Sequence, residues 1–309
     1  MTTPIRQFII LLFLCATASS VTAHTEMRTI RVAVLDLGST RTAELASETI
    51  TRVFASSNEL SLIDRTQSGP AVRGVGYAGS LNMTLEDARN LGAVIDCDFY
   101  FIGDVQTLRR SSSSRPVYYE SYASVFIVSA RSGRLVKWER PSFEAPSAVE
   151  SEKMLLAELT VRASVYLEAI QTAERSERNE RELSVIAHAP LIEDVPEEAS
   201  PQAKGLRLPQ PYRRIRPVYP DSAAKAEAIA TVDILVDLDQ EGEVEKVEVV
   251  RWAGFGLDDE TVNTVRRMHF RPAIRDGVPI PMRVLLRYNF RPTKQNTDEK
   301  NKGTDNKPT

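Results

Sequence analysis

The most regular hydrophobic pattern in the chain lies near its C-terminus, where two stretches alternate between apolar and polar residues. In residues 230–238 the apolar positions are Val232, Ile234, Val236 and Leu238. In residues 282–290 they are Val284, Leu286, Tyr288 and Phe290. A repeat of two residues places one set of side chains on one face of a strand, so each stretch is predicted to be a half-buried antiparallel β-strand.

The residues between these stretches complete a small unit. A turn at residues 239–242 leads into a second predicted strand over residues 243–252. The short helix predicted next has three apolar residues on one side: Val262, Val265 and Met268. These elements predict a small α+β domain over residues 216–292, with a three-stranded antiparallel sheet and helices packed on it.

Residues 28–182 mix strand-like and helix-like segments. Apolar, strand-like runs occupy residues 30–35, 60–64, 99–107, 118–129 and 134–139. One-sided helical spacing marks residues 41–56, residues 84–91 and the segment that starts at Ser151. The glycine-rich residues 69–80 are predicted to be a loop, and Thr84 is predicted to cap the helix that follows, with Asp87 three residues on. This order predicts an α/β domain with a mixed sheet and helices against it.

Three further segments lie outside the two domains. Residues 1–23 have one basic residue, a short apolar run and small residues at the end, as a cleaved signal peptide does. The apolar run is shorter than the about 20 residues that a spanning helix needs, so an uncleaved anchor is the less favoured alternative. Residues 183–215, with prolines among acidic residues, are predicted to be a semi-stiff linker. Residues 293–309 contain no apolar residue and are predicted to be a disordered tail.

Charge and chemistry argue against several classes of function. The net charge of −3 offers no basic footprint for nucleic acid. Cys97, the only cysteine after cleavage, is predicted to be a buried apolar residue rather than a nucleophile. Residues 74–79 match G-x-G-x-x-G, but the strand before and the helix directly after that a dinucleotide site needs are missing. The histidines lack metal-binding spacing, so we expect no enzyme, no cofactor and no metal.

The order and spacing of several motifs resemble the C-terminal domain of the TonB family. These motifs are Tyr219-Pro220, residues 239–242, Leu257-Asp258, residues 270–273 and Asp276-Gly277. The resemblance implies a domain that carries no catalytic residues and binds extended segments of outer-membrane proteins along a strand edge. It makes the last strand the docking edge, with six expected partner-binding residues: Tyr219, Pro220, Arg283, Leu285, Arg287 and Asn289.

The N-terminal domain resembles the periplasmic α/β domain of CsgG-like and TolB-type proteins. The residues that carry this likeness are 32–36, 62–65, 86–92, 98–104 and 132–136. The resemblance implies a shared type of domain. Pore formation is not carried over, because Leu14 precedes Cys15 where a lipoprotein signal has a small residue, and residues 118–129 do not read as a membrane hairpin.

Together these features predict a non-enzymatic periplasmic TonB-family adaptor. Its C-terminal domain would capture an extended segment of an outer-membrane barrel or another envelope protein. The alternative is a membrane-anchored, TonB-like energy transducer that couples the inner-membrane proton motor to outer-membrane transport, which requires residues 1–23 to stay attached. Peptidoglycan, and a second copy of the chain paired through the C-terminal strand edge, are further partners that the sequence leaves open.

Overall fold

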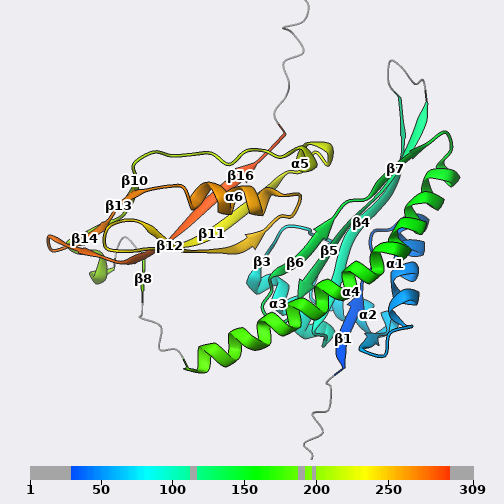
Figure 1. Ribbon diagram of the computed structural model, residues 1–309, viewed down its shortest axis with the longest axis horizontal. Coiled ribbons are helices and arrows are strands. Elements are labelled where there is room, and N and C mark those ends of the chain that lie inside the picture. Colours follow the sequence, from blue (N-terminus) through cyan, green and yellow to red (C-terminus); the bar gives the residue numbers. More distant parts are fainter. Residues whose placement is uncertain (1–28, 112–116, 187–191, 197–199, 293–309) are drawn as a thin grey trace, which may run out of the picture.

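The computed structural model describes residues 29–111, 117–186, 192–196 and 200–292. The predicted signal peptide and the predicted disordered tail lie outside these residues. The described chain forms two lobes, and the predicted mixed α/β class is confirmed (Figure 1). The long helix α4 (Ala148–Ile186) belongs to the N-terminal lobe and reaches towards the C-terminal one.

The N-terminal lobe is built on a six-stranded sheet. Its strands are β1 (Ile30–Val34), β2 (Leu60–Ile63), β4 (Phe99–Arg110), β5 (Tyr118–Ser129), β6 (Leu135–Glu139) and β7 (Ser142–Ala145). The main order is β2-β1-β4-β5-β6. β6 pairs with the C-terminal part of β5, and β7 pairs with the N-terminal part of the same strand. β1 runs parallel to β2 and β4, whereas β5 runs antiparallel to its neighbours, so the sheet is mixed.

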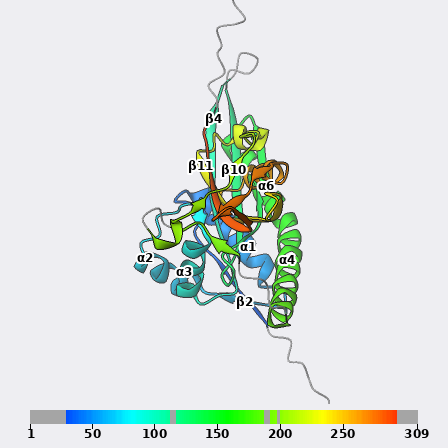
Figure 2. The ribbon, with the colours of Figure 1, turned by 90° about the vertical axis from the view of Figure 1, so that its left-hand side faces the viewer.

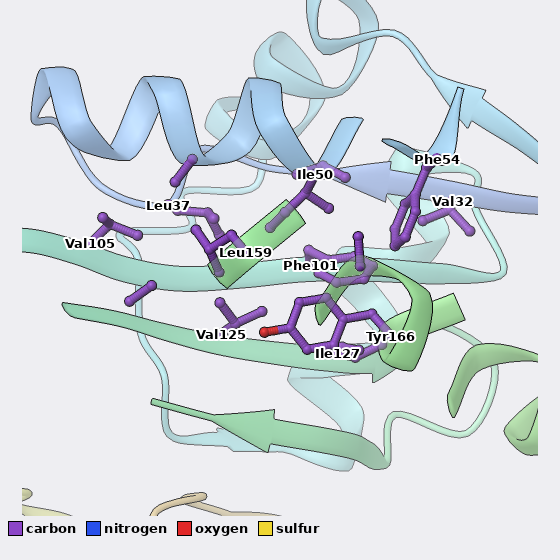
Figure 3. Close-up of a cluster of buried hydrophobic side chains, with 14 of the residues drawn as sticks. Val32, Leu37, Ile50, Phe54, Phe101, Val105, Val125, Ile127, Leu159 and Tyr166 are labelled. Carbon is purple, nitrogen blue, oxygen red and sulfur yellow. The ribbon is translucent and has the colours of Figure 1, made fainter. Parts of the chain in front are cut away.

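Helices cover both faces of this sheet (Figure 2). α1 (Arg41–Phe54) and α4 pack on one face, and α2 (Arg65–Gly74) and α3 (Leu85–Ile95) lie on the other. Phe99 and Phe101 of β4 point into the first core, while Tyr100 and Ile102 point into the second. A strand covered on both faces becomes a continuous apolar run instead of an alternating one. Figure 3 shows the first core, with Phe101 among side chains of α1 and α4.

One local prediction is wrong on the α2 face. Residues 69–80 are predicted to be a loop, but α2 continues to Gly74 and only the remainder is irregular. The carboxylate of Asp64 accepts a hydrogen bond from the backbone N–H of Thr66 at 2.7 Å. This cap satisfies an N–H group at the helix start and favours a helix in a segment whose glycine and proline content argues against one.

The C-terminal lobe contains three long antiparallel strands: β11 (Ala230–Leu238), β12 (Val244–Trp252) and β16 (Met282–Phe290). β11 is central and pairs with both of the others. The helices α5 (Asp221–Lys225) and α6 (Leu257–Val265) share one hydrophobic core with the alternating apolar residues of β11. Three short strands lead from α6 to β16: β13 (Phe270–Arg271), β14 (Ala273–Arg275) and β15 (Val278–Ile280).

The sheet is larger than the three strands expected from the sequence. It has five strands, in the order β3-β12-β11-β16-β8. β3 (Met83–Thr84) comes from the N-terminal lobe and pairs with the end of β12. β8 (Glu193–Asp194) comes from the predicted linker and runs parallel to the start of β16. Backbone groups at a sheet edge pair readily with nearby extended chain, and each edge of this sheet has taken one short segment.

The described part of the predicted linker lies along the C-terminal lobe. After β8, the 3₁₀ helix η1 (Pro201–Ala203) leads to β9 (Leu206–Arg207), which pairs with β14. β10 (Gln210–Pro211) then pairs with β13. These short pairings hold the segment against the domain that follows it. The boundary between linker and domain stays a prediction.

The two lobes meet where β3 pairs with β12, a contact that we call the domain joint. Trp252 is buried in the α3 core and donates from Nε1 to the carbonyl of Gly133 at 2.9 Å. The Asn82 amide donates to the carbonyl oxygens of Trp252 and Thr231 at 2.6 and 2.8 Å. Its oxygen accepts the N–H of Thr231 at 3.0 Å. One asparagine therefore holds two strands of the C-terminal sheet on the N-terminal lobe.

Replacing Asn82 with alanine is expected to loosen the domain joint. The change leaves partly buried backbone groups of Thr231 and Trp252 without partners, at a cost of about 1–3 kcal/mol for each group that stays unsatisfied. Urea unfolding should show a lower midpoint, and limited proteolysis should cut the chain faster between the lobes. Asn90→Ala, on the exposed side of α3, is the matched control; equal midpoints for the two variants would contradict the role of Asn82.

Candidate strand-edge binding site

Strand β16 carries four of the six residues expected to bind a partner. One face of the strand packs into the core of the C-terminal lobe through Val284, Leu286, Tyr288 and Phe290. The opposite face presents the expected residues Arg283, Leu285, Arg287 and Asn289. The alternation in the sequence therefore places these four side chains in one row.

The backbone of β16 is paired with β11 on one side and is largely open on the other. The carbonyl of Arg283 accepts a hydrogen bond from the N–H of Val195 at 3.2 Å, so the backbone polar groups of Arg283 point away from β11. Successive residues of an antiparallel strand direct their backbone groups to alternate sides. Leu285, Arg287 and Asn289 therefore point N–H and C=O to the outer edge, where no strand of the described residues pairs with them.

The start of this edge is closed by the chain itself. β8 pairs there with Met282 and Arg283. The guanidinium of Arg275 contacts the Glu193 carboxylate at 2.7 Å and holds the pKa of that carboxyl below its ordinary value. Arg283 thus lies where the edge is covered, and the open part runs from Val284 to the end of β16.

Two buried carboxylates of β11 fix the arginines of β16. Arg283 donates from Nε and Nη2 to Asp237 at 2.6 and 2.9 Å. Arg287 donates in the same way to Asp233 at 2.7 and 2.9 Å, and Arg251 of β12 adds a bond to Asp233 at 3.1 Å. The hydrogen bonds from Arg287 hold the pKa of Asp233 below its ordinary value. Such two-point contacts set the orientation of a guanidinium as well as its position.

The remaining residues of the row differ in how they are held. Leu285 lies between the two arginines and is 54% exposed. Asn289 accepts a hydrogen bond from the hydroxyl of Thr231 at 2.8 Å. The face beside the open edge therefore offers one exposed apolar side chain flanked by two oriented cations, an arrangement that fits a peptide in extended conformation.

Tyr219 and Pro220, the other two expected residues, lie near the end of β16 and not on its open edge. The Tyr219 hydroxyl donates to the carbonyls of Ala223 and Ala228 at 3.1 and 2.8 Å, and its ring stacks on Phe290 with centroids 6.5 Å apart. Pro220 stands at the start of α5. Tyr219 thus supports the last residue of β16 from the core side. Contact of either residue with a partner stays a prediction.

A cleft that the sequence does not indicate lies between β6 and β12. It measures about 420 Å³, and residues 134–138 and 246–249 line it together with Asp258. Burial raises the pKa of Asp258 to about 6, while its carboxylate accepts the N–H groups of Ala253 and Gly254 at 2.9 and 2.7 Å. These bonds hold the loop that leads into α6, so Asp258 has a structural role at the cleft wall.

Metal, thiol and dinucleotide chemistry can each be compared with the geometry of the described residues. Within them no group of three His, Cys, Asp or Glu side chains could hold a metal ion. Burial raises the pKa of the Cys97 thiol to about 12, which disfavours the reactive thiolate. Residues 74–79 begin at the last residue of the helix α2 and do not follow a strand, so the glycine pattern lacks the setting of a dinucleotide site. No helix in the described ranges has the length and apolar content to cross a membrane.

A family model assigns the part of the chain that bears this edge. The model described as "Gram-negative bacterial TonB protein C-terminal" matches residues 215–292. These residues are therefore a TonB C-terminal domain, a domain type of the Gram-negative cell envelope. The resemblance stated from the sequence is confirmed for this part of the chain. A search of curated proteins found no match.

Several solved structures are similar to parts of the chain at low identity and low TM-score. The hypothetical protein CT253 from Chlamydia trachomatis is 16% identical, with a TM-score of 0.32 and coverage of 45% of this chain and 98% of its own. The TonB C-terminal domain from Pseudomonas aeruginosa is 17% identical, with a TM-score of 0.26 and coverage of 35% of this chain and 99% of its own. The LpoB C-terminal domain from Salmonella enterica is 15% identical, with a TM-score of 0.26 and coverage of 36% of this chain and 81% of its own. Because these scores are low, the assignment rests on the family match.

The ion pairs of Asp233 are expected to make the stability of the fold depend on acid pH. Because the folded-state pKa of Asp233 is lower than that of the unfolded chain, the pairs stabilise the fold fully above about pH 4. Their contribution is lost as the pH falls through the folded-state value. Asp233→Asn should therefore lower the urea midpoint at neutral pH and flatten its decline below about pH 4.

Urea unfolding at a series of pH values checks this expectation. Asp259→Asn, at the exposed start of α6, removes the same charge without touching an arginine of the row and is the matched control. Parallel pH curves for Asp233→Asn and the parent protein would show that the ion pairs do not stabilise the fold.

Proposed function

We propose that this protein is a non-enzymatic periplasmic adaptor that captures an extended segment of an outer-membrane protein on the open edge of β16. The observation that carries the proposal is the row of outward N–H and C=O groups at Leu285, Arg287 and Asn289, in a domain of TonB C-terminal type. A segment that adds as a further strand forms main-chain hydrogen bonds with these groups. Its specificity comes from the side chains of the flanking face.

The chemistry of that face indicates which segment fits. Leu285 offers an apolar contact beside the edge. Arg287 uses Nε and Nη2 for Asp233, so Nη1 is the group available to an acceptor on the partner. An extended segment with an apolar residue opposite Leu285 and an acidic or amide side chain opposite Arg287 matches both features.

The domain joint supports an adaptor role. Because Trp252 anchors the C-terminal sheet in the N-terminal lobe, a partner on β16 is held at a set position relative to that lobe. This geometry is suited to bringing an outer-membrane protein to a second envelope component bound by the N-terminal domain. The predicted signal peptide and the TonB C-terminal domain both favour the periplasm as the place where this happens.

Cross-linking in the cell tests the edge directly. A photoreactive amino acid at Leu285, which is 54% exposed, should form covalent adducts with an outer-membrane protein under illumination. The control carries the same amino acid at Val278, which is 62% exposed but lies in β15, away from the open edge. Adducts of equal yield and identity at both positions would argue against a specific edge.

Leu285→Pro tests the contribution of the backbone N–H to binding separately from that of the side chain. Proline removes one outward N–H and leaves the ladder with β11 complete, because the polar groups of residue 285 point away from β11. Binding of peptides copied from the periplasmic ends of outer-membrane proteins should weaken by about tenfold or more. Leu285→Thr keeps the N–H and loses only the apolar contact of Leu285, so it should bind more weakly than the parent but more tightly than Leu285→Pro. Calorimetry measures both variants, and loss of binding in Leu285→Thr alone would overturn the strand-addition mode.

A further inference from the structure

Residues 200–220 differ in charge from the rest of the protein. They contain five cationic residues and no acidic one, and the five are Lys204, Arg207, Arg213, Arg214 and Arg216. The chain as a whole has a net charge of −3. The segment is therefore a local reversal of charge within a mildly acidic protein.

The fold places this segment beside a second cationic group. β10 pairs with β13, and the N–H of Tyr212 donates to the carbonyl of His269 at 2.9 Å. The guanidinium of Arg271 lies 5.7 Å from the centre of the Tyr212 ring. Figure 1 shows β10 and β13 side by side, with the chain then passing α6 on its way to α5. Residues 210–212 thus lie against residues 269–271, and we call the two segments that meet there, residues 204–218 and 266–271, the basic ridge.

The arginines of the ridge lack the carboxylate partners that arginines have elsewhere in this lobe. All seven are exposed: Arg207, Arg213, Arg214, Arg216, Arg266, Arg267 and Arg271. Among the residues that the structure describes, none of them lies within ion-pair distance of an acid, whereas Arg251, Arg283 and Arg287 each do. The one carboxylate bonded at the ridge is Glu243, which pairs with His269 at 2.9 Å.

Large apolar side chains are exposed among these cations. Leu208, Tyr212 and Val218 are 45%, 66% and 65% exposed. A cationic surface that also exposes leucine, tyrosine and valine has the two components of binding to a bilayer interface, attraction to anionic headgroups and insertion of apolar groups. Tyrosine in particular is enriched at the depth of the headgroups.

We propose that the basic ridge binds the surface of a membrane that contains anionic phospholipid. Phosphate groups of the headgroups contact the arginines, and Tyr212 and Leu208 enter the boundary between headgroups and acyl chains. The ridge belongs to segments that are separate from the open edge of β16, so this attachment does not depend on the proposed capture of a partner. An anionic glycan such as peptidoglycan offers charge but no apolar phase for Leu208 and Val218, and the exposed apolar side chains favour the lipid.

Vesicle sedimentation tests the proposal. The protein is purified from the cell envelope, so that the parent and every variant carry the same N-terminus and its contribution cancels in the comparison. The parent should sediment with vesicles that contain phosphatidylglycerol alongside phosphatidylcholine, at least about tenfold more tightly than with phosphatidylcholine alone. Added salt should reduce this preference, because screening weakens contacts between exposed charges. Equal binding to both vesicles would overturn the proposal.

Paired variants locate the binding surface. Arg213→Glu with Arg214→Glu should lower binding to the phosphatidylglycerol vesicles by about tenfold or more. Arg73→Glu with Arg89→Glu makes the same change of charge on the N-terminal lobe and should leave binding close to that of the parent. Equal losses in the two double variants would mean that net charge alone is responsible and would overturn the assignment to the ridge.

A substitution in the apolar part separates lipid from glycan. Tyr212→Ser keeps every cation and should weaken vesicle binding several-fold, because it removes the group that inserts. Sedimentation with purified peptidoglycan sacculi is run in parallel. Binding to sacculi that is sensitive to Arg213→Glu with Arg214→Glu, without binding to vesicles, would assign the ridge to the glycan and overturn the membrane proposal.

Discussion

The burial of Trp252 in the N-terminal lobe is the contact on which the arrangement of this protein depends. The residue belongs to the last position of β12, yet its ring lies 6.0 Å from that of Phe126 and its Nε1 bonds to Gly133. An aromatic residue buried this deeply excludes much apolar surface from water, and the Asn82 bonds beside it fix the direction of the strand. The β12 side of the sheet therefore faces the N-terminal lobe, and β16 is left as the outward edge.

The row of ion pairs across β11, β12 and β16 gives that edge a defined shape before any partner arrives. Asp233 and Asp237 are buried, and each is contacted by a guanidinium at two points. An edge whose side chains are already ordered loses less conformational entropy on binding than a flexible one. The same carboxylates hold β16 in register with β11, because slipping by one residue would leave two buried charges unpaired.

Local patterns in the sequence predict most of the helices and strands of the fold, but they do not predict the contacts between segments that lie far apart in the chain. The alternation in residues 282–290 is enough to place Arg283, Leu285 and Arg287 on one face, and Thr84 caps α3 through Asp87 as predicted. The pairing of β3 and β8 at the sheet edges is not predictable from two-residue strands, because it depends on tertiary contact and carries no periodic signal. The predicted linker likewise takes its form from β13, β14 and β16, which lie far along the chain.

The segment that precedes the C-terminal domain connects the two proposed surfaces while leaving them mechanically separate. β8 closes the start of the β16 edge through two residue pairs and the Arg275–Glu193 contact. Surface ion pairs of this kind contribute little, so an incoming strand longer than the open edge can displace β8 at small cost. β9 and β10 are held by their own pairings with β14 and β13. Displacement of β8 therefore extends the edge without moving the arginines of the basic ridge, and partner capture is compatible with attachment to a membrane.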